Sequence, residues 1–266
     1  MNILITGTNG FIGKNLKNKL SDEYNIFTFE ESDIEGDWKS KLSNIFNKGV
    51  VCVFHVGACS DTLEQKVNYM MLLNYEVTKH ITDLCVEYKV PLIYSSSAAN
   101  YGTNDEYPSN LYGWSKYVGE GYVISNGGIG LRYFNVYGPG EENKGRMSSV
   151  AYQMYIKNNN GEEIKLFPKK PLRDFVYVND IVDANIFAFE NFKHLNSKWY
   201  EVGSGTANSF ESVLDNMGIS YSYHEESIIP EGYQFYTCSN KSKWMSKWSP
   251  NYQLEKGIED YLKYLL

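Results

Sequence analysis

A tyrosine and a lysine lie four residues apart in the segment 112–116, which reads Tyr-Gly-Trp-Ser-Lys. On a helix this spacing places the side chains of Tyr112 and Lys116 on the same face. A free phenol, with a pKa near ~10, is a poor base at neutral pH, and a neighbouring ammonium group favours its ionised form. Tyr112 could therefore exchange a proton with a substrate hydroxyl. Tyr-x-x-x-Lys also occurs often by chance. The pair therefore indicates a catalytic site only where the sequence also contains the other residues that such a site needs.

Three consecutive serines, Ser95, Ser96 and Ser97, end a segment that we predict to be a strand. Ligands of doubly wound parallel sheets bind at the carboxyl ends of the strands, where a serine hydroxyl can bind a reacting oxygen. We assign this role to Ser97. The sequence therefore predicts a catalytic group of Ser97, Tyr112 and Lys116, and the last two are also expected to contact a cofactor.

A glycine-rich segment, residues 7–13, joins the first predicted strand to the first predicted helix and reads Gly-Thr-Asn-Gly-Phe-Ile-Gly. Such glycines permit a tight turn and let backbone N–H groups approach a pyrophosphate at the N-terminus of a helix. The position between an apolar strand and an amphipathic helix favours a dinucleotide site over a plain glycine turn. We expect cofactor contacts from Gly7, Asn9, Gly10, Phe11, Ile12 and Gly13.

The residue that ends the second predicted strand, Glu30, bears on which dinucleotide binds. An acidic side chain there accepts hydrogen bonds from the adenosine ribose and repels a 2′-phosphate, which favours NAD. Lys39 and Lys41 follow closely and could offset that repulsion, so NADP stays open. His55, which ends the third predicted strand, is interpreted as a packing residue or as support for the cofactor.

These residues can meet only if short strands alternate with helices along the chain. Apolar and amphipathic segments do alternate up to about Val136, which predicts an α/β fold with a Rossmann-like, doubly wound parallel sheet. The predicted strands are 2–6, 25–29, 50–55, 91–95 and 129–134, and the helices between them are 11–20, 38–46, 63–88 and 112–124. Later elements are helices at 147–157, 178–192, 209–217 and 254–266 and a strand at 220–224. We predict a dinucleotide-binding domain over 1–136, completed by parts of 172–206, and a small, mainly substrate-binding part over 137–266.

The composition argues against several other functions. The 266 residues include 32 acidic and 25 basic side chains with no basic block, which argues against nucleic acid as a partner. No apolar run is long enough to span a bilayer and no signal peptide precedes the first strand, so a cytoplasmic protein without a membrane partner is expected. The cysteines show no metal-ligand spacing, so no metal is expected, and we interpret them as structural thiols.

Several longer segments match a known family. Residues 132–139 read Arg-Tyr-Phe-Asn-Val-Tyr-Gly-Pro, and residues 173–178 read Arg-Asp-Phe-Val-Tyr-Val. With the Gly-x-x-Gly-x-x-Gly spacing of residues 7–13, they resemble the extended short-chain dehydrogenase/reductase family of NAD-dependent epimerases and dehydratases. The segments His-x-Gly-Ala-Cys-Ser at 55–60 and Lys-Gly-x-Met-x-Ser-Val-Ala at 144–151 are more particular to the ADP-L-glycero-D-manno-heptose 6-epimerases within it.

The resemblance implies roles for residues that no spacing argument identifies. Lys144 stands where the heptose enzymes keep a second candidate acid/base, although without the family a solvated surface lysine is the better interpretation. Arg173 and Tyr233 would hold the diphosphate and the sugar, although Arg173 could equally pair with Asp174. An Asp-hydrophobic pair at 33–34 would contact adenine, although Asp33 is equally typical of a turn. The implied cofactor contacts are Asp33, Ile34, His55, Gly57, Ala58 and Asn74, and the implied substrate contacts are Ser60, Ser97, Asn135, Lys144, Arg173 and Tyr233.

The resemblance also implies an activity and a partner. The enzyme would oxidise a nucleotide-diphosphate sugar at C6″ with NAD or NADP, which stays bound and is recycled, and return the hydride to the opposite face. Tyr112 and Lys144 would divide the proton transfers, because one base cannot readily serve both faces. A homo-oligomer is expected, with the helices 63–88 and 112–124 as the usual dimer surface.

Two alternatives stay open. The segments between Ser97 and Tyr112, after Gly205 and before Asp33 are shorter than in the heptose enzymes, and these loops decide specificity. Another nucleotide-sugar epimerase or reductase, such as a UDP-hexose 4-epimerase, is therefore one alternative. Dehydratases usually carry an Asp-Glu pair after the strand-end residue, and the sequence Ser-Ala-Ala-Asn at 97–100 disfavours them. The other alternative is a non-catalytic dinucleotide-binding protein, against which the intact Ser, Tyr and Lys set argues.

Overall fold

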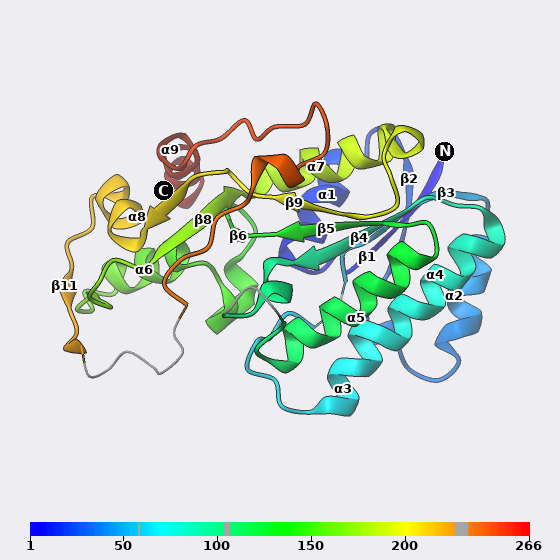
Figure 1. Ribbon diagram of the computed structural model, residues 1–266, viewed down its shortest axis with the longest axis horizontal. Coiled ribbons are helices and arrows are strands. Elements are labelled where there is room, and N and C mark those ends of the chain that lie inside the picture. Colours follow the sequence, from blue (N-terminus) through cyan, green and yellow to red (C-terminus); the bar gives the residue numbers. More distant parts are fainter. Residues whose placement is uncertain (58, 104–106, 227–233) are drawn as a thin grey trace. The chain divides into compact units, whose positions relative to one another are not determined.

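Six strands pair in one sheet in the order β2-β1-β3-β4-β5-β9 (Figure 1). The pairs from β2 through β5 are parallel, which confirms the predicted fold class. Since β1 lies between β2 and β3, the strand order reverses there, and doubly wound sheets bind ligands beside such a reversal. The strands are β1 (Asn2–Thr6), β2 (Asn25–Phe29), β3 (Val50–His55), β4 (Leu92–Ser97), β5 (Ile129–Tyr133) and β9 (Trp199–Val202).

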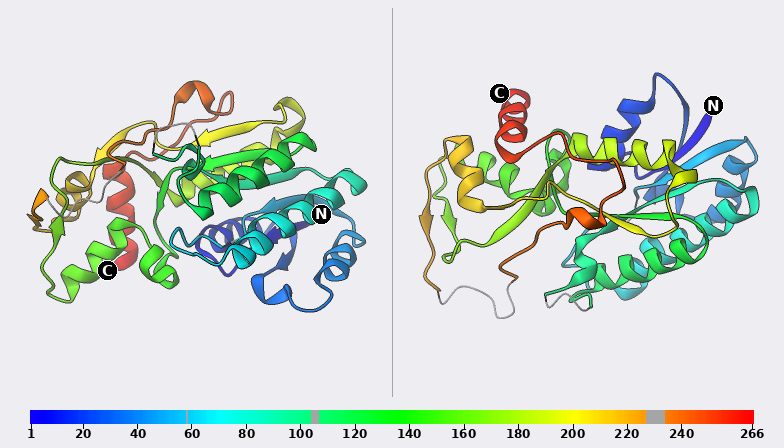
Figure 2. Two further views of the ribbon diagram at one scale, coloured as in Figure 1. Left: turned by 60° about the horizontal axis from the view of Figure 1, so that its bottom comes forward. Right: turned by 45° about the horizontal axis from the view of Figure 1, so that its top comes forward.

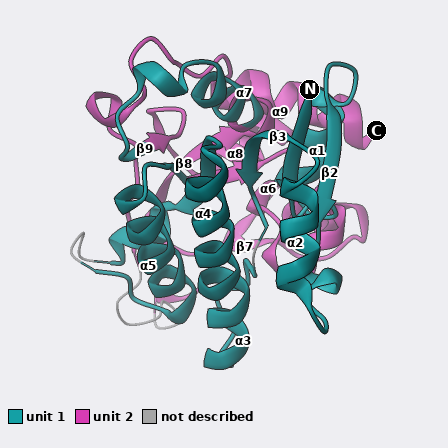
Figure 3. Ribbon diagram, turned by 90° about the vertical axis from the view of Figure 1, so that its right-hand side faces the viewer, with its two compact units in different colours: residues 1–133, 182–200 teal, residues 134–181, 201–266 magenta. Residues whose placement is uncertain are grey.

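The computed structural model describes residues 1–57, 59–103, 107–226 and 234–266. They form two compact units (Figure 3), of which the first comprises residues 1–133 and 182–200 and the second comprises residues 134–181 and 201–266. Each unit is described by itself below. The predicted catalytic group of Ser97, Tyr112 and Lys116 lies entirely in the first unit.

Helices of the first unit pack on the sheet because strand residues alternate between its two faces. Val53 of β3 joins a core cluster with Leu42, Ile81 and Val123, which come from three different helices. Its neighbour Phe54 packs edge-on against Phe189 instead. Both views in Figure 2 show α4 and α5 running side by side. The helices are α1 (Phe11–Leu20), α2 (Trp38–Phe46), α3 (Val67–Met71), α4 (Val77–Tyr88), α5 (Leu111–Ser125) and α7 (Val178–Glu190), whose first turn belongs to the second unit.

Three departures from the predicted elements bear on the site. The helix predicted over 63–88 begins at Val67 and contains a π-helical turn, η2 (Leu72–Glu76), before α4. Strand β4 continues to Ser97, two residues beyond the predicted end. Strand β9 was not predicted, because four residues give too short a pattern.

The second unit is built around a three-stranded sheet in the order β10-β8-β6. Its core is rich in aromatic side chains, among them Tyr137, Phe175, Tyr177 and Tyr261. The predicted helices and the strand at 220–224 are present, with α6 beginning three residues late because Ser149 caps it. The elements are β6 (Asn135–Tyr137), η4 (Glu142–Met147), α6 (Val150–Asn159), β7 (Lys165–Leu166), β8 (Leu172–Tyr177), β10 (Ala207–Ser209), α8 (Phe210–Met217), β11 (Ser222–Tyr223) and α9 (Leu254–Leu265).

Among the described residues, none of the helices has the length and apolar character that crossing a membrane requires.

Candidate active site

The glycine turn between β1 and α1 is closed so tightly that side chains would not fit. Gly7 has φ +70°, and a Cβ there would come within 2.5 Å of the Gly57 Cα. A Cβ on Gly13 would come within 2.1 Å of the Gly7 carbonyl oxygen. Gly10 begins α1 without any side-chain cap. A close backbone turn at an uncapped helix N-terminus fits the diphosphate of a dinucleotide, as the sequence predicts.

Glu30 follows β2 and faces this turn. One carboxylate oxygen accepts hydrogen bonds from the Thr8 N–H at 2.8 Å and the Thr8 hydroxyl at 2.7 Å, and the other accepts from the Asn9 N–H at 3.2 Å. The negative charge is thereby held beside the turn, which disfavours a 2′-phosphate there. Lys39 lies over the ring of Trp38, 5.5 Å from its centroid.

Asp33 and Ile34 form the turn that follows Glu30. The Asp33 carboxylate accepts the Glu30 N–H at 2.8 Å, in a reciprocal capping box. Ile34 packs against the core cluster beneath α2 and α4. The sequence left two functions open for Asp33, a turn residue and an adenine contact. The Asp33 carboxylate has the first of these, because it stabilises the turn.

The catalytic group gathers at the carboxyl end of β4. Ser97 is the last residue of that strand, and Tyr112 stands in the first turn of α5, which Asn110 caps by accepting the Gly113 N–H at 2.8 Å. The Ser97 hydroxyl accepts the Ala99 N–H at 3.1 Å and lies near enough to the Tyr112 phenol to act toward lowering its pKa. One turn further along α5, the Lys116 ammonium donates to the Ser95 carbonyl at 2.9 Å. The three residues that the sequence selected by spacing are therefore brought together at one strand end.

Burial shifts the pKa of both ionisable members of this group. Desolvation raises the pKa of Tyr112, and the hydroxyl of Ser97 acts in the opposite direction. Desolvation lowers the pKa of Lys116 to about 8. The sequence argument expected the neighbouring ammonium to favour the phenolate. That expectation is wrong for the protein alone, because removal from water outweighs the other influences on the phenol.

A buried ion pair supports the strand end from behind, and the sequence analysis missed it. Glu120 accepts the Ser96 hydroxyl at 2.6 Å and two hydrogen bonds from Arg132, at 2.9 and 2.5 Å. The Arg132 guanidinium also lies over the rings of Tyr101 and Trp199, at 4.7 and 3.9 Å from their centroids. The available signal was that Glu120 follows Lys116 by four residues, on the same face of α5.

The other predicted cofactor residues of the first unit surround the glycine turn and the helices beside it. Gly57 donates its N–H to the Thr6 hydroxyl at 2.8 Å. Asn74 is buried in the π-helical turn and exchanges two hydrogen bonds with the Cys59 backbone. The ring of His55 is also buried. Ser60, a predicted substrate contact, is exposed in the loop after β3. Ala58 lies outside the described residues.

Predicted substrate residues of the second unit lie on less regular elements. Asn135 is the exposed first residue of β6. Lys144 stands in the 3-10 segment η4 and is partly buried, not fully solvated, so that desolvation lowers its pKa while Glu141 opposes the change. Tyr233 lies outside the described residues.

Arg173 and Asp174 are neighbours on β8 with different partners. The Arg173 guanidinium donates to the backbone carbonyls of Leu172 and Gln234. The Asp174 carboxylate is buried and accepts the backbone N–H groups of Ser204, Gly205 and Ser239, at 2.6, 3.1 and 2.9 Å, as well as the Ser204 hydroxyl. Asp174 thus has a structural function, and neither side chain of this pair needs the other as its partner.

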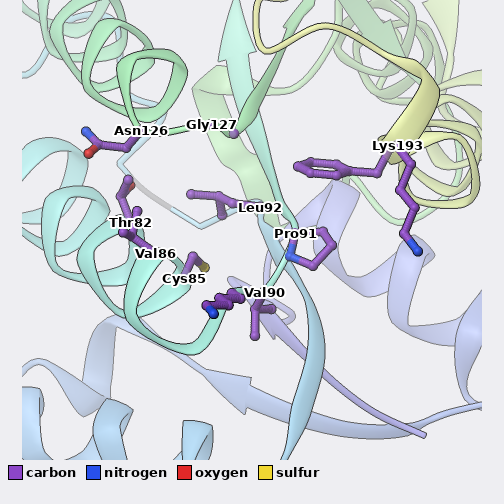
Figure 4. A pocket seen from close by; sticks show the side chains of 12 residues that line it. Thr82, Cys85, Val86, Val90, Pro91, Leu92, Asn126, Gly127 and Lys193 are labelled. Carbon is purple, nitrogen blue, oxygen red and sulfur yellow. The ribbon is translucent and has the colours of Figure 1, made fainter.

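A pocket of about 500 Å³ in the first unit is a different site (Figure 4). It lies where β4 begins, at the opposite end of the strand from Ser97, and contains none of the predicted site residues. Its walls come from the end of α4, the start of β4, the turn before β5 and the segment after α7, and include Cys85, Val86, Val90, Pro91, Leu92, Gly127 and Phe192.

Comparisons with known proteins identify the family. Residues 3–203 match the model of the NAD dependent epimerase/dehydratase family. The chain is 33% identical to the ADP-L-glycero-D-manno-heptose-6-epimerase of Brachyspira hyodysenteriae, over 99% of this chain and 97% of the relative. The alignment extends over 314 positions, so segments of the relative have no counterpart among the 266 residues here.

Solved structures show the same fold. The Helicobacter pylori ADP-L-glycero-D-manno-heptose-6-epimerase superimposes with a TM-score of 0.86 at 28% identity, covering 99% of this chain and 96% of that one. The Thermotoga maritima UDP-glucose 4-epimerase, solved with UDP-glucose, gives a TM-score of 0.84 at 23% identity, covering 100% and 98%. At the latter identity the likeness shows the fold alone.

Proposed function

The chain belongs to the NAD-dependent epimerase/dehydratase family, as its motifs predicted, and from this premise we propose that it epimerises ADP-glycero-manno-heptose at C6″. It is an NAD-dependent nucleotide-sugar epimerase. The observation that carries the proposal is the meeting of Ser97, Tyr112 and Lys116 at the end of β4, in a chain that matches a heptose epimerase over nearly its whole length. The choice of sugar rests on that relative.

Residues of the first unit would move a proton at one substrate oxygen. NAD, when bound on the glycine turn, supplies the acceptor and donor of hydride. Tyr112, in its ionised form, would take the proton from the reacting hydroxyl while Ser97 hydrogen-bonds the same oxygen. Lys116 would keep a positive charge one helical turn beyond Tyr112 on α5, and its ammonium is already oriented by the Ser95 carbonyl. Because the cofactor is regenerated in each turnover, we expect it to stay bound.

Residues of the second unit would bind the substrate and complete the proton transfers. Lys144 is our proposed second acid/base, supported by its partial burial, because a lysine with a lowered pKa is a better base near neutral pH. Arg173 would bind the diphosphate through a guanidinium whose plane two backbone carbonyls fix. Asn135, Ser60 and Tyr233 complete the proposed substrate set.

The test is to incubate the protein with each C6″ epimer of the ADP-heptose and follow the configuration by NMR. We expect interconversion of the two epimers without added cofactor. UDP-glucose serves as the competing substrate, because C4 epimerisation would identify the alternative activity. Absence of interconversion in a protein that carries NAD would refute the proposed sugar.

We also infer that two copies associate through α5 and that the enzyme works in the cytoplasm. Trp114, Tyr117 and Val118 are exposed at 42, 37 and 36%, and Gly121 leaves open space one turn further along the same helix. An exposed apolar stripe of this kind favours a protein partner. The four cysteines are free thiols, which suits a reducing compartment. Native mass spectrometry would measure the number of copies.

A further inference from the structure

Buried polar side chains connect the glycine turn of the first unit to the helix that carries Tyr112. Thr6, His55, Asn74, Thr78 and Ser115 are each at most 2% exposed. Polar groups in such a place destabilise a protein unless they are paired. Each of these side chains is hydrogen-bonded, and together they form a continuous series between two parts of the site.

The directions of the hydrogen bonds around His55 can be assigned. Thr78 donates its one hydroxyl hydrogen to the Asn74 carbonyl at 2.8 Å, because a carbonyl only accepts. The 2.8 Å contact between His55 Nε2 and Thr78 Oγ1 must then be a donation from an Nε2–H. The buried hydroxyl of Tyr94 has no hydrogen-bond partner among the described residues, so it takes no part in this assignment.

The other ring nitrogen faces the glycine turn. Thr6 lies opposite His55 in the register of β1 and β3, and its hydroxyl stands 2.7 Å from His55 Nδ1. In a neutral ring that already has a hydrogen on Nε2, Nδ1 accepts and Thr6 donates. The Thr6 oxygen in turn accepts the N–H of Gly57, the residue against which Gly7 packs.

From Thr78 the series continues to the catalytic helix. Asn74 supplies the carbonyl that Thr78 uses, and its side-chain amide donates to the Ser115 hydroxyl at 2.9 Å. Ser115 donates to the carbonyl of Tyr112 at 2.7 Å. One imidazole ring thus lies midway between the close contact of Gly7 with Gly57 and the first turn of α5.

We propose that His55 is a positioning residue, held as the neutral Nε2–H tautomer, which fixes the glycine turn and the Tyr112 helix relative to each other. The proposal rests on the nicotinamide site of the proposed function and not on the identity of the sugar. Its two nitrogens have separate tasks: Nδ1 holds the cofactor side through Thr6, and Nε2 holds the catalytic side through Thr78.

A charged ring would not satisfy this arrangement. An imidazolium donates from both nitrogens, so Thr6 Oγ1 would have to accept from His55 as well as from Gly57 and would turn its own hydrogen away from the ring. The surroundings also oppose the charge, because burial, with the Lys116 charge acting in the same direction, lowers the pKa of His55 to about 3. The neutral ring is therefore the form present at neutral pH.

The tautomer can be read directly from wild-type protein. In protein labelled with ¹⁵N-histidine, two-bond ¹H–¹⁵N spectra distinguish a ring nitrogen that carries hydrogen from one that does not, and only four histidines contribute. We expect Nε2 of His55 to carry the hydrogen and Nδ1 to be bare at pH 7. The opposite tautomer, or a charged ring, overturns the proposal whatever the enzyme's substrate.

Two substitutions then separate the two tasks. In His55→Asn the amide oxygen can still accept from Thr6, whereas in His55→Gln the longer amide can still donate to Thr78. We expect the Kd for NAD to rise about ten-fold in His55→Gln and clearly less in His55→Asn, since losing a buried hydrogen bond has that order of effect. We expect kcat to fall about ten-fold in His55→Asn and clearly less in His55→Gln.

The controls distinguish positioning from general destabilisation. His194→Gln changes an exposed histidine of the same unit and should alter neither parameter. Equal changes of Kd and kcat in both His55 variants, or a change confined to the melting temperature, would show a merely structural histidine. Should wild-type protein prove inactive on every nucleotide sugar, the proposed function fails while the tautomer and the NAD affinities still test His55.

Discussion

The two units hold their predicted site residues in different ways. In the first unit Lys116 donates to the Ser95 carbonyl near the end of β4. The same strand end is held by the buried ion pair of Glu120 and Arg132. In the second unit Lys144 stands in a short 3-10 segment, and Arg173 is held by two backbone carbonyls. One fold can serve many substrates when the reacting groups lie on strand ends and the groups that select the substrate lie on loops. The predictions below test that division.

The largest effect should come from the phenol of the first unit. Tyr112→Phe keeps the ring but removes the proton-transfer group, so we expect kcat to fall by about 10³-fold or more, while the protein still binds NAD. The matched control is Tyr223→Phe, an exposed phenol on β11. Turnover by the Tyr112 variant at the wild-type rate would remove Tyr112 from the mechanism.

Breaking the buried ion pair of Glu120 and Arg132 should give the next largest effect, a loss of stability. Arg132→Ala leaves the Glu120 carboxylate buried without its partner, and we expect the free energy of unfolding to fall by about 3–5 kcal/mol. Lys79→Ala breaks the exposed pair with Asp83, at 2.9 Å, and should cost at most about 1 kcal/mol. Urea unfolding measures both. Equal losses would mean that the strand end does not depend on this pair.

Lys144 decides whether the second unit takes part in the chemistry. If it is the second acid/base, Lys144→Met should lower kcat by about 10²-fold, and Lys144→Arg should not restore it, because a guanidinium does not give up its proton. Lys157→Met, at the exposed end of α6, is the control. A change in KM alone would make Lys144 a binding residue and confine proton transfer to the first unit.

Lys116 should have a smaller effect of the opposite sign on stability. Its folded pKa of about 8 lies below that of a free lysine, near ~10.5, so the unfolded chain binds more protons between these pH values. The ammonium therefore destabilises the folded state below about pH 8, and the penalty disappears above about pH 10.5. We expect Lys116→Met to raise the free energy of unfolding at pH 7 by about 1–3 kcal/mol while activity is lost. A decrease, in urea unfolding at pH 7, would contradict the pKa.

The sequence predicted the part of the site that depends on regular elements. Ser97, Tyr112 and Lys116 were found because strand ends and helix faces have fixed periods, and the glycine turn because its spacing has a steric cause. Glu120 was missed because a charged residue on an amphipathic helix reads as a surface position. The raised pKa of Tyr112 was missed because spacing carries no information about desolvation.

Other misses have physical causes as well. The π-helical turn at 72–76 follows no sequence period, so the predicted helix ran through it. Strands of two to four residues, such as β6, β7, β9 and β10, give no usable alternation, and the six-residue β8 was missed because its nearly all buried residues do not alternate either. The functions of Asp33 and Asp174 depend on backbone N–H groups that only the folded chain brings near them.

The π-helical turn has a consequence for how this chain can change in length. Such a turn contains one residue more than the helix needs, and each residue of an α-helix advances by about 100°. Since a π-helical turn absorbs its extra residue by advancing less than that angle per residue, deleting a single residue between Leu72 and Glu76 would give a regular helix in which α3 and α4 keep about their present directions, while the side chains within the turn would be redirected. Asn74 would then leave the Cys59 backbone and Ser115. The loss of one codon in this stretch would thus break the hydrogen bonds of Asn74 in the interior, although the helix itself would become more regular.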